Sequence, residues 1–215
     1  MCQKEKIIVI GGGGHAKVII SILKKLGKYE IIGFTDIEVK KPILGISFLG
    51  SDEALSGYCN KGIKQAVIGL GQIKSSEFRK KAVKKISDIG FEFPAIISPD
   101  SIINEDVCIG QGTVIMDRVT INSGTRVGSF SIINTNASID HDCVIGNYTH
   151  IAPGAILSGE VKIGNDVLIG TGTSIIQSIE IPDSCIISAG SSVQKTIFEQ
   201  GIYRGVPAEF IRKFE

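Results

Sequence analysis

The 215-residue sequence predicts two folds in succession, a small α/β domain with a parallel sheet and then an all-β solenoid. Two observations support this prediction. The first third of the chain alternates apolar runs with amphipathic stretches, which is typical of strands that alternate with helices. The remainder carries a branched aliphatic residue at every sixth position over about 100 residues, a period that neither a helix nor a hairpin meander explains.

Residues 1–96 are expected to form the α/β domain. The expected elements, in chain order, are a strand over KIIVI, a helix with Val18, Ile19, Ile22, Leu23 and Leu26 on its apolar side, a strand over YEIIGFTD, a strand over residues 64–70 and a basic-faced helix over residues 75–90. This alternation predicts a small parallel sheet of Rossmann-like type.

A glycine-rich turn follows the first strand. Gly11, Gly13 and Ala16 match the pattern G-x-G-x-x-A, and Asp36 ends the next strand about 20 residues later. In this arrangement, backbone N–H groups and a helix N-terminus hold a phosphate. The acidic residue can hold a ribose hydroxyl or a base edge.

His15 and Lys17 start the expected helix on the side where a diphosphate would sit. They favour phosphate binding over a tight turn without a ligand. An NAD site is the alternative, but only about three strands precede the repeat, which is half of a full dinucleotide-binding fold.

The six-residue repeat runs from Ile97 to Val193, and four residues after each aliphatic comes a small or β-branched residue such as Thr125. Short strands joined by tight turns, three to a coil of about 18 residues, fit this period. The aliphatics are expected to fill the coil interior, and the small residues the places where it narrows. We expect glycines to supply the turn dihedrals directly after the aliphatic, at Gly110, Gly128, Gly146, Gly164 and Gly170.

Composition excludes several classes of partner. A net charge of +1 with 21% charged residues gives no electrostatic reason to expect nucleic acid or an acidic membrane. No apolar run approaches the roughly 18–20 residues that span a bilayer, so we expect no membrane insertion and a cytoplasmic location. The five cysteines form no CxxC pair, which predicts neither a disulfide framework nor a metal site. Cys143 and Cys185 fall in the small interior position and are expected to be packing residues.

The repeat resembles the left-handed parallel β-helix of the hexapeptide-repeat acyltransferases. Together with "GGGGHAK" and the small α/β domain, it resembles the bacterial nucleotide-sugar N-acetyltransferases of the sialic acid O-acetyltransferase/UDP-4-amino-sugar acetyltransferase family, from Ile7 to about Phe210. The resemblance implies a nucleotide-sugar-binding domain over 1–96, an acetyltransferase β-helix over 97–196 and a capping tail over 197–215. It also implies acetyl-CoA as cosubstrate, no metal, and a homotrimer with active sites at subunit interfaces.

The implied reaction acetylates the 4-amino group of a nucleotide-linked amino-deoxy-sugar, with UDP as the expected nucleotide, in surface glycan or glycoprotein sugar synthesis. His141 follows the inward-facing Ile139 by two residues, so its ring should point outward, where a neutral imidazole can act as a general base. The segment N-T-N-A-S-I-D-H-D resembles the family's segment around its catalytic base. By the same resemblance Asp142 orients His141, although Asp140 is an alternative, and the backbone N–H of Gly159 stabilises the oxyanion.

The resemblance also implies ligand contacts. The nucleotide-sugar contacts are expected at Gly11, Gly13, His15, Lys17, Asp36 and Asn134, and the acetyl-CoA contacts at His150, Gly159, Gly170 and Arg204. His141 and His150 belong to consecutive walls of one coil, so both can serve one site only if a second subunit lies alongside. Two alternatives remain open: an O-acetyltransferase acting on sialic acid or a related sugar, and a non-catalytic β-helix that binds a nucleotide.

Overall fold

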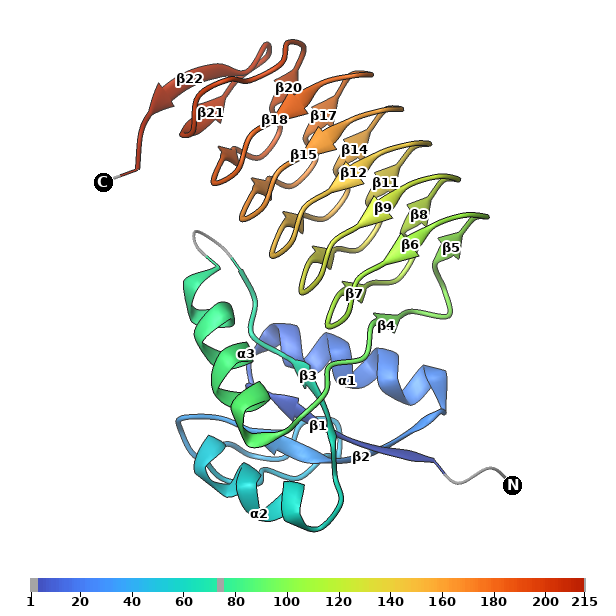
Figure 1. Cartoon of the computed structure of the whole chain (residues 1–215), viewed down its shortest axis with the longest axis vertical. Coiled ribbons are helices and arrows are strands. Elements are labelled where there is room, and N and C mark those ends of the chain that lie inside the picture. Colours follow the sequence, from blue (N-terminus) through green and yellow to red (C-terminus); the bar gives the residue numbers. More distant parts are fainter. Residues whose placement is uncertain (1–3, 73–75, 215) are drawn as a thin grey trace. The chain divides into compact units, whose positions relative to one another are not determined.

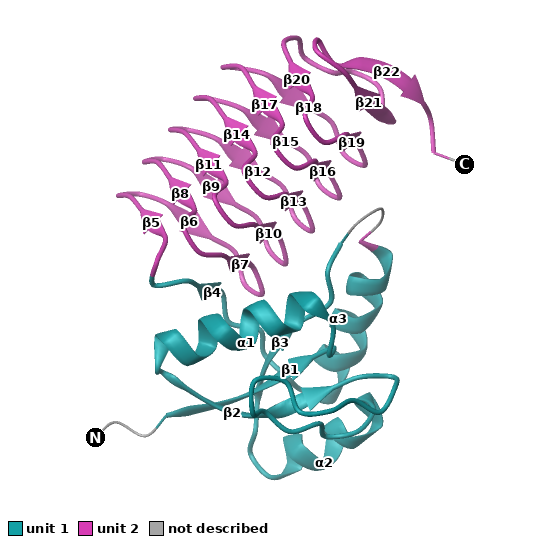
Figure 2. Cartoon of the chain, turned by 180° about the vertical axis from the view of Figure 1, so that it is seen from behind, with its two compact units in different colours: residues 1–72, 77–99 teal, residues 73–76, 100–215 magenta. Residues whose placement is uncertain are grey.

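The computed structural model describes residues 4–72 and 76–214. Of these, residues 4–72 and 77–99 form one compact unit, and residue 76 with residues 100–214 forms the other (Figures 1 and 2). Cys2 lies outside the described residues, and so does residue 75, where the helix expected over residues 75–90 begins.

The first unit is the predicted α/β domain. Its elements are β1 (Glu5–Ile10), α1 (Gly14–Leu26), β2 (Tyr29–Thr35), a 3-10 turn at Asp52–Ala54, α2 (Leu55–Asn60), β3 (Gln65–Ile68), α3 (Glu77–Ile89) and β4 (Ile96–Ile97). The strands β2, β1 and β3 form a parallel sheet in that order. The central strand β1 is apolar from Ile7 to Ile10 and fully buried there, as expected for a strand covered on both faces. The short α2 was not predicted, because "LSGYCN" is too short to show a helical period.

Helix α1 packs through one apolar stripe, and one residue of the predicted stripe is wrong. The buried face includes Ala16, Ile19, Ile20 and Leu23, which follow the i, i+3, i+4, i+7 spacing of a helix. Val18 is 39% exposed, because it lies beside this stripe. The helix ends at Gly27, which adopts a left-handed conformation and donates its N–H to the carbonyl of Leu23.

The second unit is the predicted solenoid, a left-handed parallel β-helix of two-residue strands. The strands are β5 (Ile102–Ile103), β6 (Cys108–Ile109), β7 (Val114–Ile115), β8 (Thr120–Ile121), β9 (Arg126–Val127), β10 (Ile132–Ile133), β11 (Ser138–Ile139), β12 (Val144–Ile145), β13 (His150–Ile151), β14 (Ile156–Leu157), β15 (Lys162–Ile163), β16 (Leu168–Ile169), β17 (Ser174–Ile175), β18 (Glu180–Ile181), β19 (Ile186–Ile187) and β20 (Ser192–Val193). Three parallel walls run β19-β16-β13-β10-β7, β20-β17-β14-β11-β8-β5 and β18-β15-β12-β9-β6 (Figure 1).

The register advances 18 residues per coil, as predicted. Ile139 pairs with Ile121 on one side and with Leu157 on the other, and all three side chains are buried. Ile103 and Ile109 are only half-buried, because the first coil of this unit has a stacked coil on one side only.

The small interior positions are also buried as predicted, except Ser101 and Val107, which are half-buried. The hydroxyls among them have a second role. The Thr149 hydroxyl donates to the carbonyl of Gly164 at 2.8 Å, one coil further along. Thr125 and Ser131 make equivalent bonds, so these slots satisfy carbonyls at the corners of the coil. Cys143 and Cys185 are buried in the same slots, which confirms them as packing residues. Burial raises the pKa of the Cys143 thiol to about 11.

The predicted reason for the turn glycines is wrong. The left-handed residue lies three positions after each interior aliphatic, and it is often not glycine, as at Arg118, Phe130 and Tyr148. The glycines directly after the aliphatic are needed for space instead. A Cβ on Gly128 would lie 2.7 Å from the backbone of the next coil, and the other four are crowded in the same way: Gly110, Gly146, Gly164 and Gly170.

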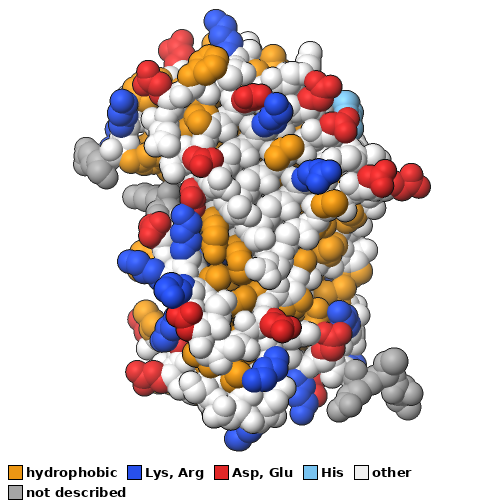
Figure 3. Space-filling model, viewed as in Figure 1, with side chains coloured by type: hydrophobic (Ala, Val, Ile, Leu, Met, Phe, Trp, Pro, Cys, Tyr) orange, Lys and Arg blue, Asp and Glu red, His pale blue; other side chains and the backbone are white. Residues whose placement is uncertain are grey.

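A hairpin follows the last coil. Strand β21 (Ile202–Arg204) pairs with β19 in parallel, and β22 (Glu209–Arg212) pairs with β21 in antiparallel. The rings of Tyr203 and Phe210 meet edge to face with centroids 5.5 Å apart. Acidic and basic side chains are interspersed on the face drawn in Figure 3. Within residues 4–72 and 76–214, no helix is long and apolar enough to cross a bilayer.

Candidate active site

His141 lies in the turn that joins β11 to β12. The hydroxyl of Thr125 holds this turn from inside the coil, because it donates to the carbonyl of Asp140 at 2.7 Å and accepts the N–H of Cys143 at 3.1 Å. Interior packing therefore fixes the two ends of the turn, and the side chains between them point outward. The His141 side chain is 56% exposed, so the ring lies outside the interior, as predicted.

His141 and Asp142 form a hydrogen-bonded pair. The Nδ1 atom of His141 lies 2.9 Å from Oδ2 of Asp142. An ionised carboxylate only accepts hydrogen bonds, so in the neutral form of the imidazole Nδ1 carries the proton and Nε2 keeps its lone pair. The hydrogen bond to Asp142 raises the pKa of His141, and the nearby charges of Asp140, Asp142 and Glu160 add to this effect.

Two glycines, one coil away on either side, make room for this pair. A Cβ on Gly159 would lie 2.6 Å from both Cε1 and Nε2 of His141. A Cβ on Gly124 would lie 2.4 Å from Oδ1 of Asp142. The imidazole therefore lies directly against Gly159, and no described residue accepts a hydrogen bond from the Gly159 N–H. A residue whose backbone N–H has no described acceptor thus lies next to the ring nitrogen that faces away from Asp142.

Asn134 and His150 form a second contact. Asn134 Nδ2 lies 3.1 Å from His150 Nε2, and Asn134 Oδ1 accepts the N–H of Thr135 at 2.8 Å. The structure thus joins two residues that the sequence assigned to different ligands. His150 begins β13, whereas His141 lies in the turn after β11, so the two histidines occupy different parts of the coil.

The glycine turn of the first unit is ordered by Asp36. Its Oδ2 accepts the N–H of Gly12 at 2.8 Å, and its Oδ1 accepts the N–H of Glu38 at 3.2 Å. Gly11 has a φ of +100°, and a Cβ on Gly12 would lie 2.6 Å from the ring of Phe34. The sequence singled out Gly11 and Gly13 as nucleotide-sugar contacts and gave Gly12 no role. In the structure, however, a side chain at Gly12 would collide with Phe34.

Helix α1 begins directly after this turn. Gly13 caps it without a side-chain hydrogen bond, and its first turn carries no acidic residue. His15 is half-buried and Lys17 is exposed. A helix N-terminus favours an anion. The only carboxylate described at this turn is that of Asp36, which is held by the N–H of Gly12 just before the cap.

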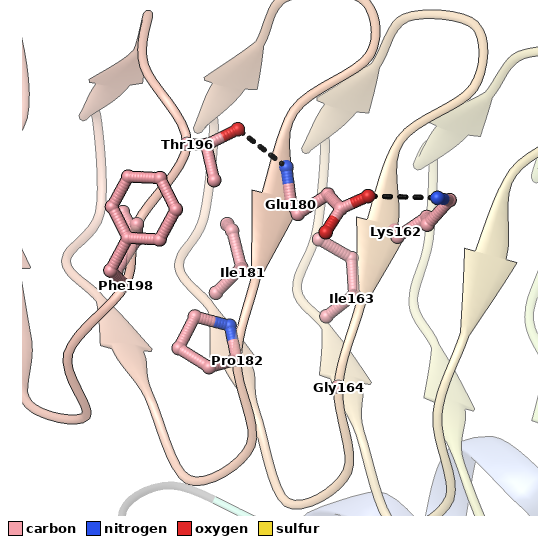
Figure 4. Close-up of a pocket in the computed structure, with 9 residues that line it drawn as sticks. Lys162, Ile163, Gly164, Glu180, Ile181, Pro182, Thr196 and Phe198 are labelled. Carbon is pink, nitrogen blue, oxygen red and sulfur yellow. Dashed lines mark hydrogen bonds and ion pairs between the residues drawn. The ribbon is translucent and has the colours of Figure 1, made fainter.

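The remaining predicted contacts lie elsewhere on the solenoid unit. Gly170 is crowded by the backbone of Ala189, and Arg204 is exposed on β21. A shallow depression of about 340 Å³ near the end of the solenoid was not predicted (Figure 4). The Lys162 and Glu180 side chains at this depression pair at 2.7 Å, which leaves neither charge uncompensated. The described part of the chain holds no cluster of three or more His, Cys, Asp or Glu side chains suited to a metal ion.

Comparisons with known proteins agree with this architecture. Residues 6–86 match the model of the PglD N-terminal domain, and residues 124–159 match the bacterial transferase hexapeptide (six repeats). The H141A mutant of GDP-perosamine N-acetyltransferase from Caulobacter crescentus, solved with CoA and GDP-perosamine, is 30% identical, with 97% of each chain covered and a TM-score of 0.90.

Two further solved structures are similar over nearly the whole chain. The acetyltransferase domain of PglB from Neisseria gonorrhoeae is 29% identical, and 97% of this chain and 100% of that one are covered with a TM-score of 0.89. WeeI from Acinetobacter baumannii is 25% identical at the same coverage, with a TM-score of 0.82.

The fold and these similarities define the class of the protein: it is an enzyme, an acyltransferase built on a hexapeptide β-helix. The chain belongs to the family of nucleotide-sugar N-acetyltransferases that join a PglD-type N-terminal domain to this helix.

Proposed function

We propose that this protein transfers an acetyl group from acetyl-CoA to the 4-amino group of a nucleotide-linked amino-deoxy-sugar. The observation that carries the proposal is the outward-facing His141–Asp142 pair, with the ring against Gly159. A similar structure, GDP-perosamine N-acetyltransferase, was solved with CoA and GDP-perosamine, which supports this class of donor and acceptor.

In the proposed mechanism, the neutral sugar amine attacks the thioester carbonyl. A C–N bond forms and Nε2 of His141 takes the amine proton. The C–S bond then breaks, and the proton passes from His141 to the departing CoA thiolate. Asp142 keeps the Nδ1 proton in place and stabilises the imidazolium, as the acid does in any His–acid pair.

The oxyanion of the tetrahedral intermediate needs a hydrogen-bond donor. The Gly159 N–H is the proposed donor, because it is without an acceptor among the described residues and belongs to the residue that lies against the His141 ring. Loss of one such donor typically costs about 3–4 kcal/mol of transition-state stabilisation.

The proposed nucleotide site is the turn of the first unit with the N-terminus of α1. Backbone N–H groups near Gly13 would hold the diphosphate, and His15 and Lys17 would face it from the first turn of the helix. Asp36 orders this turn through Gly12, which supports a role in binding through the shape of the turn as well as through its own carboxylate. Asn134 remains the proposed sugar contact, and His150, Gly170 and Arg204 the proposed CoA contacts.

We further propose a homotrimer with active sites at its subunit junctions. The positions flanking the His141 turn support a subunit interface, because Val144 and Ile156 point outward and are 42% and 53% exposed. Analytical ultracentrifugation tests this, and a monomeric active enzyme would contradict it.

A thiol-release assay tests the proposed activity. Acetyl-CoA is supplied with UDP-, dTDP- or GDP-linked 4-amino-sugars, with the matching 4-hydroxy sugars as controls, and with free sialic acid. We expect thiol release only with a 4-amino-sugar, with UDP as the preferred nucleotide. Release with sialic acid would indicate an O-acetyltransferase, and no release with any acceptor would reject the proposal.

A further inference from the structure

A ladder of polar side chains rises along one corner of the solenoid and ends at His141. Its members, Asn104, Asn122 and Asp140, are spaced by 18 residues, which places each one a coil above the last. Asn104 Nδ2 donates to Asn122 Oδ1 at 2.7 Å, and Asn122 Nδ2 donates to Asp140 Oδ1 at 2.9 Å. The same Asp140 oxygen accepts the backbone N–H of His141 at 2.8 Å.

The ladder fixes the conformation of Asp140. Two donors converge on its Oδ1 from different directions, so its carboxylate cannot turn without breaking one bond. The Asn122 bond, with the His141 N–H, holds the pKa of Asp140 below its usual range, so the group is a carboxylate at neutral pH. Asp142 is then the carboxylate that pairs with the His141 ring.

We propose that Asn122 and Asp140 are positioning residues for acetyl transfer, which hold the backbone of His141 so that its ring lies against Gly159. This inference rests on the proposed role of His141 as the general base. The two residues touch neither ring nitrogen, so they act through the His141 backbone and through the charge of Asp140.

The negative charge of Asp140 makes its role measurable through the pH dependence of the reaction, which a purely structural role would not change. The acidic groups facing His141 are Asp142 on the same turn, Asp140 before it and Glu160 in the next coil. All three raise the pKa of His141, and Asp142 does so most through its hydrogen bond. Neutralising Asp140 should therefore lower the pKa of the base, even though an asparagine keeps an oxygen at the same place.

A second ladder in the same solenoid offers a matched control. Asn147, Asn165 and Asp183 repeat the same residue types at the same spacing. Asn147 Nδ2 donates to Asn165 Oδ1 at 3.1 Å, and Asn165 Nδ2 donates to Asp183 at 3.2 Å. This ladder holds turns that carry no histidine, and its side-chain oxygens also accept the backbone N–H groups of Asn147 and Asn165. It therefore measures what breaking a polar ladder costs away from the proposed base.

The experiment compares Asn122→Ala and Asp140→Asn with Asn165→Ala and Asp183→Asn in the full-length enzyme. We measure kcat, KM for both substrates, the pH dependence of kcat and the midpoint of thermal unfolding. We expect Asn122→Ala to lower kcat by about 5- to 100-fold, because a base displaced by up to 1 Å loses that much rate. We expect Asp140→Asn to move the acid limb of the pH profile to lower pH.

The two control variants should keep the wild-type kcat and pH profile, even where they lose thermal stability to the same extent. Equal kcat and pH profiles in both ladders would overturn the positioning role. If Asn122→Ala does not fold, the kcat and the pH profile of Asp140→Asn together decide the question, each compared with that of Asp183→Asn.

A different result would show that the proposed function, and not only the positioning role, is wrong. A His141→Ala variant with wild-type kcat would remove the base on which this inference rests. An inactive His141→Ala with ladder variants that match their controls would leave the base in place and reject only the positioning role.

Discussion

Replacing Gly159 with alanine tests how closely the ring of His141, the proposed base, packs against this residue. The added Cβ would lie 2.6 Å from Nε2 and Cε1 of His141. A normal contact is about 3.5 Å, so the ring must move by about 0.9 Å. A displacement of about 1 Å at a reacting group costs roughly 10²-fold in rate, or about 2.7 kcal/mol in the barrier. The Gly159 N–H remains in the variant, so the loss comes from the ring and not from a missing oxyanion donor.

Stability should change little in this variant. Gly159 does not have a positive φ, so alanine fits its backbone, and the crowded atoms belong to the outer end of an exposed ring. The assay measures kcat with saturating acetyl-CoA and amino-sugar nucleotide, and calorimetry measures the unfolding midpoint. Gly57→Ala is the control, because a Cβ there meets no heavy atom within 4 Å. A Gly159→Ala enzyme with the wild-type kcat would refute the proposed seating of the ring.

Three further predictions follow from the same geometry. Asp142→Asn replaces the charged acceptor of the His141 Nδ1 proton with a neutral one, which weakens the interaction that raises the pKa of His141. The acid limb of kcat/KM against pH should therefore shift to lower pH while the plateau falls by about 10²-fold; an unmoved limb would contradict the pairing. Gly128→Ala should lower stability by about 1–3 kcal/mol, because the new Cβ meets backbone that cannot yield, and denaturant unfolding measures this loss; an unchanged midpoint would argue against the crowding. Asp36→Ala leaves the Gly12 N–H without its acceptor and should weaken nucleotide-sugar binding by about tenfold in titration calorimetry; an unchanged Kd would separate Asp36 from the nucleotide site.

The periodic part of the fold could be predicted from the sequence, because a six-residue period has few structural solutions. Burial of Ile139 and exposure of His141 both follow from that register. The conformation of the turns could not be predicted in this way. The left-handed position accepts Arg118 and Phe130 as well as glycine, so residue type does not mark it.

The neighbours of the His141–Asp142 pair could have been predicted from the length of the coil. Gly159 lies 18 residues after His141 and Gly124 lies 18 before Asp142, so each residue faces its partner across one coil. The same rule finds Asn122 next to Asp140. Residues 18 positions apart are therefore neighbours in this fold. Searching the sequence at this spacing, as well as at six residues, identifies the residues around the site.

The α/β unit carries less periodic information, and its turn was predicted less completely. The glycine pattern indicated Gly11 and Gly13, but the hydrogen bond from Gly12 to Asp36 depends on how β1 and β2 lie next to each other. Sequence spacing alone does not contain that distance. Val18 was likewise placed wrongly on the buried side of α1. Which residues at the edge of an apolar stripe are buried depends on how the helix is rotated against its sheet.

The most direct test of the account is single-turnover acetyl transfer by His141→Ala with acetyl-CoA and the acceptor nucleotide-sugar both bound. If His141 is the general base, the rate falls about 10²- to 10⁴-fold below that of the wild type, with unchanged affinity for both ligands. A variant that transfers the acetyl group at the wild-type rate would show that another group accepts the proton, and would contradict the account.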